Sequence, residues 1–142
     1  MEKVEVHVKY QISESIENVF DAIVNAKKLT KFFTSNASGN LSEGAKIIWT
    51  FGDAGVSSEV EVLKIIENSE IRFDWSSNGK QYGRVTIKLF SIDENHSTID
   101  ITESAFEFTK EGVQTALGQT QGWTDFACSL KAFLYTGINL RK

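Results

Sequence analysis

Apolar and polar residues alternate at the start of the chain. Val4, Val6 and Val8 are separated by charged or polar residues, and Tyr10 and Ile12 continue the same period. A period of two places alternate side chains on one face of a strand. The pattern predicts a β-strand over residues 4–12 with one buried face.

The spacing of apolar residues then changes to three and four. Ser13 precedes Glu14 and Glu17, which predicts a helix capped by Ser13 with acids that complement its dipole. Its apolar stripe consists of Ile16, Val19, Phe20 and Ile23. Leu29, Phe32 and Phe33 predict a second short helix.

Period two returns in the middle of the chain. It predicts five strands, over residues 46–51, 57–66, 70–75, 82–92 and 97–104. Turn residues such as Gly55 and the pair Asn78-Gly79 separate them. Because a parallel return needs a crossover of about a dozen residues or more, these short links predict an antiparallel meander.

Helical spacing marks the C-terminal segment. It predicts a long helix whose buried stripe contains Trp123, Phe126, Ala127, Leu130, Phe133, Leu134 and Ile138. The order of elements predicts an α+β fold in a single domain spanning residues 1–142.

The opposite face of that helix is almost uncharged. Only Asp125 and Lys131 carry charge between Gly112 and Asn139. Two interpretations stay open: an ordinary solvated polar face, or a face covered by a second subunit in a homodimer. Gly118 and Gly122 each cost about 1 kcal/mol in a helix interior. We expect a close approach to the sheet there; the alternative is a hinge or late helix start that opens a cavity.

Several segments resemble the START-like superfamily. Residues 13–23 and 28–33 are similar to its first two helix signatures, and residues 44–51 and 62–75 to the strands that follow. Residues 122–134 resemble the branch named for the activator of the heat-shock-protein-90 ATPase. The resemblance implies a helix-grip fold, in which a curved antiparallel β-sheet wraps around a long C-terminal α-helix and two short helices follow the first strand.

The same resemblance implies an apolar cavity between sheet and helix, without a single chemistry, since the superfamily includes carriers, receptors, cyclases and co-chaperones. Large apolar residues supply a candidate ligand-binding wall, although each of them could also simply fill the core. The candidates are Trp49, Phe51, Val60, Val62, Phe73, Trp75, Val85, Ile87, Leu89, Phe106, Phe108, Trp123, Phe126 and Leu130.

Charged residues within the strands could add specificity to such a wall. Period two directs Arg72 and Arg84 toward solvent but places Glu103 on the inward face of Ile99 and Ile101. A buried carboxylate without partners is costly. We therefore add Glu103 to the candidate cavity residues.

Charge and composition exclude several classes. The net charge is -4 and there is no basic stripe, which argues against a nucleic-acid partner. No apolar run is long enough for a transmembrane segment, and the charged start does not resemble a signal peptide, so we expect a cytoplasmic protein.

Residues for metal or covalent chemistry are sparse. Cys128 is the single cysteine, and His7 and His96 are far apart, so we expect no metal site and no cofactor. No nucleophile, base and orienting acid can be assembled, and we assign no catalytic residue.

Three hypotheses follow. The first is a binding protein for a small hydrophobic or amphipathic molecule. The second is a co-chaperone-like interaction domain with a chaperone partner. The third is a cyclase- or hydrolase-like enzyme that uses Glu103, a tyrosine and bound water.

Overall fold

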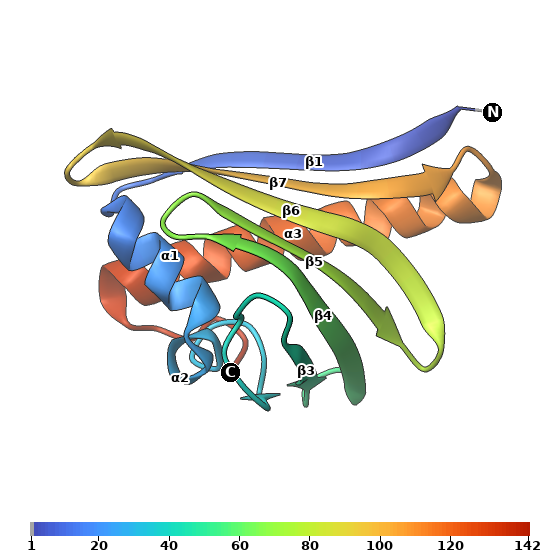
Figure 1. Cartoon of the computed structure of the whole chain (residues 1–142), viewed down its shortest axis with the longest axis horizontal. Coiled ribbons are helices and arrows are strands. Elements are labelled where there is room, and N and C mark those ends of the chain that lie inside the picture. The colour runs from blue at the N-terminus through green and yellow to red at the C-terminus, as the bar shows by residue number, and fades with distance from the viewer. Residues whose placement is uncertain (1) are drawn as a thin grey trace.

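The computed structural model describes residues 2–142 as one antiparallel sheet with a long helix across one face (Figure 1). The sheet contains seven strands in the order β1-β7-β6-β5-β4-β3-β2. The strands are β1 Lys3–Ile12, β2 Asn36–Ala37, β3 Lys46–Phe51, β4 Val56–Ile66, β5 Glu70–Ser77, β6 Lys80–Asp93 and β7 His96–Glu107. This architecture confirms the predicted α+β helix-grip fold.

Alternation decides which face of each strand is buried. In β4, Ser58, Val60 and Val62 are buried, while Glu59 and Glu61 between them are exposed. The buried face packs toward the helix because it removes apolar surface from water. Strands β3 to β7 form the predicted antiparallel meander, whereas β1 pairs with β7, far away in sequence.

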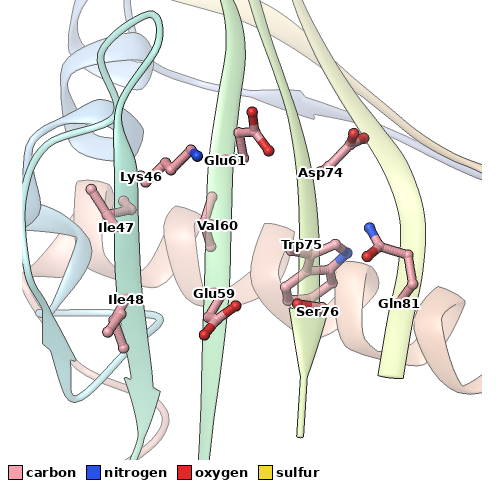
Figure 2. A pocket seen from close by; sticks show the side chains of 10 residues that line it. All are labelled: Lys46, Ile47, Ile48, Glu59, Val60, Glu61, Asp74, Trp75, Ser76 and Gln81. Carbon is pink, nitrogen blue, oxygen red and sulfur yellow. The ribbon is translucent and has the colours of Figure 1, made fainter. Parts of the chain in front are cut away.

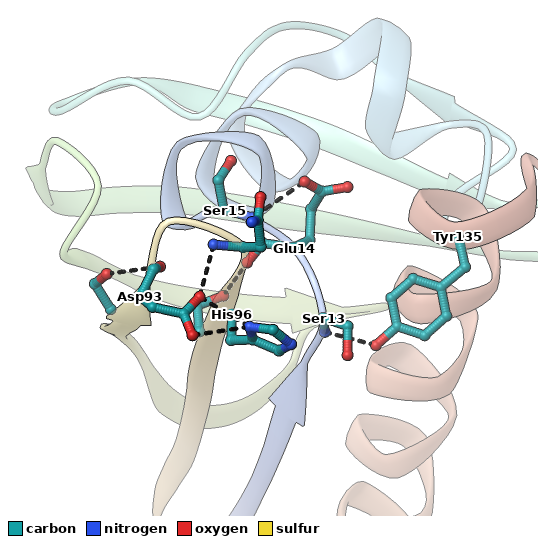
Figure 3. Close-up of polar contacts among 9 residues, drawn as sticks. Ser13, Glu14, Ser15, Asp93, His96 and Tyr135 are labelled. Atoms are coloured by element: carbon teal, nitrogen blue, oxygen red, sulfur yellow. Dashed lines mark hydrogen bonds and ion pairs between the residues drawn. The ribbon is translucent and has the colours of Figure 1, made fainter.

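Two short helices, α1 Ile16–Val24 and α2 Ala26–Leu29, follow β1. The cap of α1 is Ser15, whose hydroxyl accepts the Asn18 N–H at 3.2 Å, so the prediction of a Ser13 cap is wrong. The backbone N–H of Ser13 instead donates to the Tyr135 hydroxyl at 2.7 Å (Figure 3). That bond fastens the end of β1 to the last turn of the long helix.

The long helix α3, Lys110–Thr136, is capped by Thr109 and ends at Gly137, whose φ is 77°. Trp123, Phe126 and Leu130 are buried along it, as predicted. The placement of Ile138 in the buried stripe is wrong, since Ile138 follows the helix end and is exposed. A left-handed residue such as Gly137 terminates a helix and turns the chain away.

Gly118 and Gly122 of α3 do not lie against the sheet. A methyl group built at Gly118 or Gly122 has no heavy atom within 4 Å. The expected close approach to the sheet is therefore wrong, and because α3 starts at Lys110, the helix does not begin late either. Gly122 borders the cavity described below.

Aromatic rings fill much of the space between the sheet and α3. The ring centroids of Phe33 and Phe126 are 4.7 Å apart, those of Trp49 and Phe73 5.3 Å, and those of Phe73 and Trp123 6.4 Å. The first two pairs are edge-to-face, a geometry that stabilises a core beyond the area that it buries. The space around these rings is thus filled by side chains.

Candidate functional site

A cavity of about 220 Å³ opens between the sheet and α3. Strands β3 to β6, the link after α2, helix α3 and the segment after it all contribute side chains. Its lining consists of Phe33, Phe51, Ala54, Val56, Ser58, Trp75, Ser77, Tyr82, Gln119, Gly122, Trp123 and Arg141. Five of these residues are aromatic, which makes the wall mostly ring surface with a few polar groups.

Glu103 lies directly behind this wall and is fully buried. Its carboxylate accepts the indole N–H groups of Trp75 and Trp123, each at 2.8 Å. The Gly83 backbone N–H and the Gln119 amide donate to it at 3.0 Å and 2.9 Å. These donors take up the acceptor positions of both oxygens, so the carboxylate holds the two indoles in place.

Gly83 lets the carboxylate come this close to the strand. A methyl group on Gly83 would lie 2.7 Å from Cγ of Glu103 and 2.9 Å from the Ser104 carbonyl oxygen. Any larger residue would push the carboxylate away from its donors. The inward direction of Glu103 agrees with the period-two pattern of β7.

The residues of the candidate wall divide into three groups. Phe51, Trp75 and Trp123 line the cavity. Trp49, Val60, Val62, Phe73, Val85, Ile87, Leu89, Phe126 and Leu130 are buried in the packed core instead. Phe106 is buried near the start of α3, and Phe108, which we expected in the wall, is 63% exposed beside it.

Sequence analysis missed the polar lining residues Ser58, Ser77, Gln119 and Arg141. Ser58 and Ser77 are buried, and their hydroxyls are 2.6 Å apart. The alternation pattern could have indicated both serines, because Ser58 lies on the same face of β4 as Val60, and Ser77 on the same face of β5 as Trp75. Small polar residues on an apolar strand face mark places where a pocket fixes a ligand with few hydrogen bonds.

Arg141 closes the rim of the cavity and was not predicted. Its guanidinium donates to Asp53 in the β3–β4 turn and to Asp125 on α3, both at 2.9 Å. It also lies 5.8 Å from the ring centres of Phe33 and Phe51. Contacts with distant elements place it there, so no local pattern could have found it.

A second hollow of about 480 Å³ lies on the outer face of the sheet (Figure 2). Glu59, Glu61 and Asp74 project there between the buried residues of β4 and β5. Glu61 stands opposite Asp74 across the two strands, and Lys46 opposite Glu61. Ile47, Ile48, Val60 and Trp75 also border it, but the other six lining residues are charged or polar. We therefore interpret it as solvated surface and take the smaller, mostly aromatic cavity as the candidate site.

The two histidines and the cysteine do not line the cavity. His7 pairs with Asp100 at 2.9 Å, and His96 pairs with Asp93 in the β6–β7 turn (Figure 3). The Asn95 backbone N–H and the His96 ring lower the pKa of Asp93 from its ordinary value. Cys128 is exposed on α3. Within residues 2–142 no group of three His, Cys, Asp or Glu side chains could hold a metal ion.

The long helix is also the natural place to look for a membrane span. Across residues 2–142, however, no helix combines the length and apolar character that crossing a bilayer requires.

The chain resembles known proteins over most of its length. Residues 13–135 match the family described as activator of Hsp90 ATPase homolog 1-like protein. The chain belongs to this family. The match confirms the resemblance found in the sequence. None of the curated proteins matches the chain.

Several solved structures share this fold. A protein from Staphylococcus saprophyticus is 25% identical with a TM-score of 0.82, covering 97% of this chain and 96% of its own. The Aha1 dimer from Colwellia psychrerythraea is 23% identical with a TM-score of 0.78, covering 94% and 98%. An HSP90 activator from Plasmodium falciparum is 22% identical with a TM-score of 0.73, covering 92% and 95%.

Proposed function

We propose that this member of the activator family binds a small hydrophobic or amphipathic molecule in the cavity between the sheet and α3. The observation that carries the proposal is the aromatic wall of Phe33, Phe51, Trp75, Tyr82 and Trp123 around open space. Binding pockets are typically concave and mostly apolar, with a few placed polar groups. The buried serine pair and Gln119 supply such groups.

The size of the cavity limits the ligand. Its volume of about 220 Å³ lies below the 300 to 1,000 Å³ typical of pockets for drug-sized ligands. A compound of one or two rings therefore fits better than a long acyl chain. The tightly packed rings around Trp49 and Phe73 leave little room for a longer tail.

Replacing Gly122 by leucine is expected to abolish ligand binding. A Cβ atom on Gly122 has no heavy atom within 4 Å, so a leucine is tolerated there, and it extends from the cavity lining. Indole, at a concentration about ten times its dissociation constant, should raise the melting temperature of the wild-type protein by roughly 4 °C. The shift should disappear in Gly122→Leu.

Gly118→Leu is the matched control. Gly118 lies four residues earlier on the same helix, has equally open surroundings and does not line the cavity. It should keep the indole-dependent shift. Native mass spectrometry of freshly purified protein should in addition detect a bound small molecule. The proposal would be wrong if indole and related one- and two-ring compounds left the melting temperature unchanged and mass spectrometry detected no bound molecule.

A second candidate function is stimulation of a chaperone ATPase, and it is favoured by the family membership. If it holds, adding the protein to the Hsp90-type chaperone of its host should raise the ATPase rate severalfold in a coupled assay. Gly122→Leu should stimulate equally well, because this role uses the outer surface. An unchanged rate up to a large excess of protein would remove this candidate.

A further inference from the structure

We propose that the preferred ligand carries a positive charge, so that the cavity takes a small organic cation such as an arylammonium. The inference rests on the proposed function and names the ligand class of the same site. It depends on three observations, which concern the rings, the surrounding charges and the contacts of Arg141.

Aromatic rings form the largest part of the cavity wall. Trp75 is 5.0 Å from Tyr82 and 5.6 Å from Trp123, measured between ring centroids, and Phe33 is 5.1 Å from Phe51. Ring faces carry negative potential, and several rings around one space attract a cation, most strongly when tryptophan is among them. An ammonium group in this cavity would meet rings from five different segments of the chain.

The Glu103 carboxylate strengthens this preference. It accepts the N–H groups of both wall tryptophans, Trp75 and Trp123. Hydrogen bonds to a charged acceptor polarise the donor, which moves electron density into the indole rings. The two rings that are best suited to bind a cation are thus the two that are polarised by a buried negative charge.

The charges around the cavity also favour a cation. Arg141 is the positive residue of the lining, and it is paired with Asp53 and Asp125. Glu103 behind the wall adds a third carboxylate, so three carboxylates and one guanidinium lie in or next to the cavity wall. An anionic ligand would have to compete with two aspartates for Arg141, whereas a cation meets an excess of negative charge.

The side chain of Arg141 already places a positive charge at the rim of the cavity. The guanidinium of Arg141 lies 5.8 Å from the centres of both the Phe33 and Phe51 rings, within the range of cation–π contacts. The chain's own side chain therefore uses part of the same ring surface that the ligand would use. Arg141 should act as an internal competitor for a bound cation.

Three probes of similar shape and different charge test the inference. They are phenyltrimethylammonium, its neutral analogue tert-butylbenzene, and the anion benzoate, each measured by isothermal titration calorimetry. The protein is titrated into the hydrocarbon because the latter is sparingly soluble. We expect phenyltrimethylammonium to bind about tenfold more tightly than tert-butylbenzene, and benzoate to bind most weakly.

Variants separate the contributions of the rings and the rim. Arg141→Gln should lower the dissociation constant of phenyltrimethylammonium by about fivefold. The dissociation constant of tert-butylbenzene should stay nearly unchanged. Arg84→Gln is the control, since Arg84 is paired with Asp74 away from the cavity. Tyr82→Leu should raise the dissociation constant of phenyltrimethylammonium by about fivefold. Phe108→Leu, at an exposed ring outside the cavity, should leave it unchanged.

The outcomes distinguish the two proposals. If tert-butylbenzene binds as tightly as the cation, the charge preference is wrong and the binding function stands. If benzoate binds best and Arg141→Gln weakens it, the cavity selects anions and the inference is overturned. If none of the probes binds, both proposals fail for ligands of this size. A preference for the cation that increases in Arg141→Gln would support both.

Discussion

Glu103→Ala is expected to lower the free energy of unfolding by about 4 kcal/mol. The carboxylate accepts hydrogen bonds from Trp75, Gly83, Gln119 and Trp123. Its removal leaves these donors with no acceptor in a buried place, and each unsatisfied donor costs about 1–3 kcal/mol. Urea denaturation followed by tryptophan fluorescence measures the change and reports the environment of the wall tryptophans.

The control for this prediction lies on the same strand. Glu107 is exposed and pairs with exposed Lys3, so Glu107→Ala should change stability by no more than about 0.5 kcal/mol. Glu103→Gln keeps the size but turns an amide N–H₂ toward donors, and a loss of about 2 kcal/mol is expected. If Glu103→Ala is as stable as the wild type, burial of the carboxylate costs as much as its hydrogen bonds contribute.

Gly112→Ala should be the second most damaging change, lowering the free energy of unfolding by about 3 kcal/mol. A methyl group at Gly112 would overlap the carbonyl oxygen of Glu107 and lie 2.8 Å from its carbonyl carbon. Both atoms belong to the backbone at the end of β7, so relief requires a shift of the link between β7 and α3. Thermal and urea unfolding both measure the loss.

The same substitution at Gly118 should have the opposite sign. No heavy atom lies within 4 Å of a methyl group built there. Gly118→Ala should therefore raise the free energy of unfolding by about 1 kcal/mol, because alanine favours the helix and restricts the unfolded chain. Equal effects at Gly112 and Gly118 would contradict the tight packing of the first turn of α3 on the end of β7.

These stability effects and the proposed site are connected. The Glu103 network holds Trp75 and Trp123, and those two rings form part of the cavity wall. A wall positioned by buried hydrogen bonds keeps its shape without a ligand, which lowers the entropic cost of binding. Such preorganisation is what a small cavity needs, because a small ligand offers few contacts to offset that cost.

Much of the fold was predictable because it depends on local periodicity. The alternation in β1 and the stripe of Trp123, Phe126 and Leu130 each reflect one element with one apolar face. The inward direction of Glu103 follows from the same rule. Short links between strands β3 to β7 predicted their antiparallel order, since such links allow no crossover.

Local patterns did not predict features that depend on distant contacts. Ser15 rather than Ser13 caps α1, while the Ser13 N–H is bonded to Tyr135 at the far end of the chain. Gly118 and Gly122 face open space although a helix glycine often marks close packing. Each of these outcomes requires knowing which segments meet in three dimensions.

The candidate site shows the same division. The sequence by itself determined that Trp75, Trp123 and Glu103 face inward, because period two and helical spacing assign each residue to a face. Only the tertiary structure decided that Trp49 and Phe73 fill the core, while the tryptophan pair borders a cavity closed by Arg141. Periodicity states which side of an element is buried, whereas the volumes of side chains from distant segments decide where space remains between them.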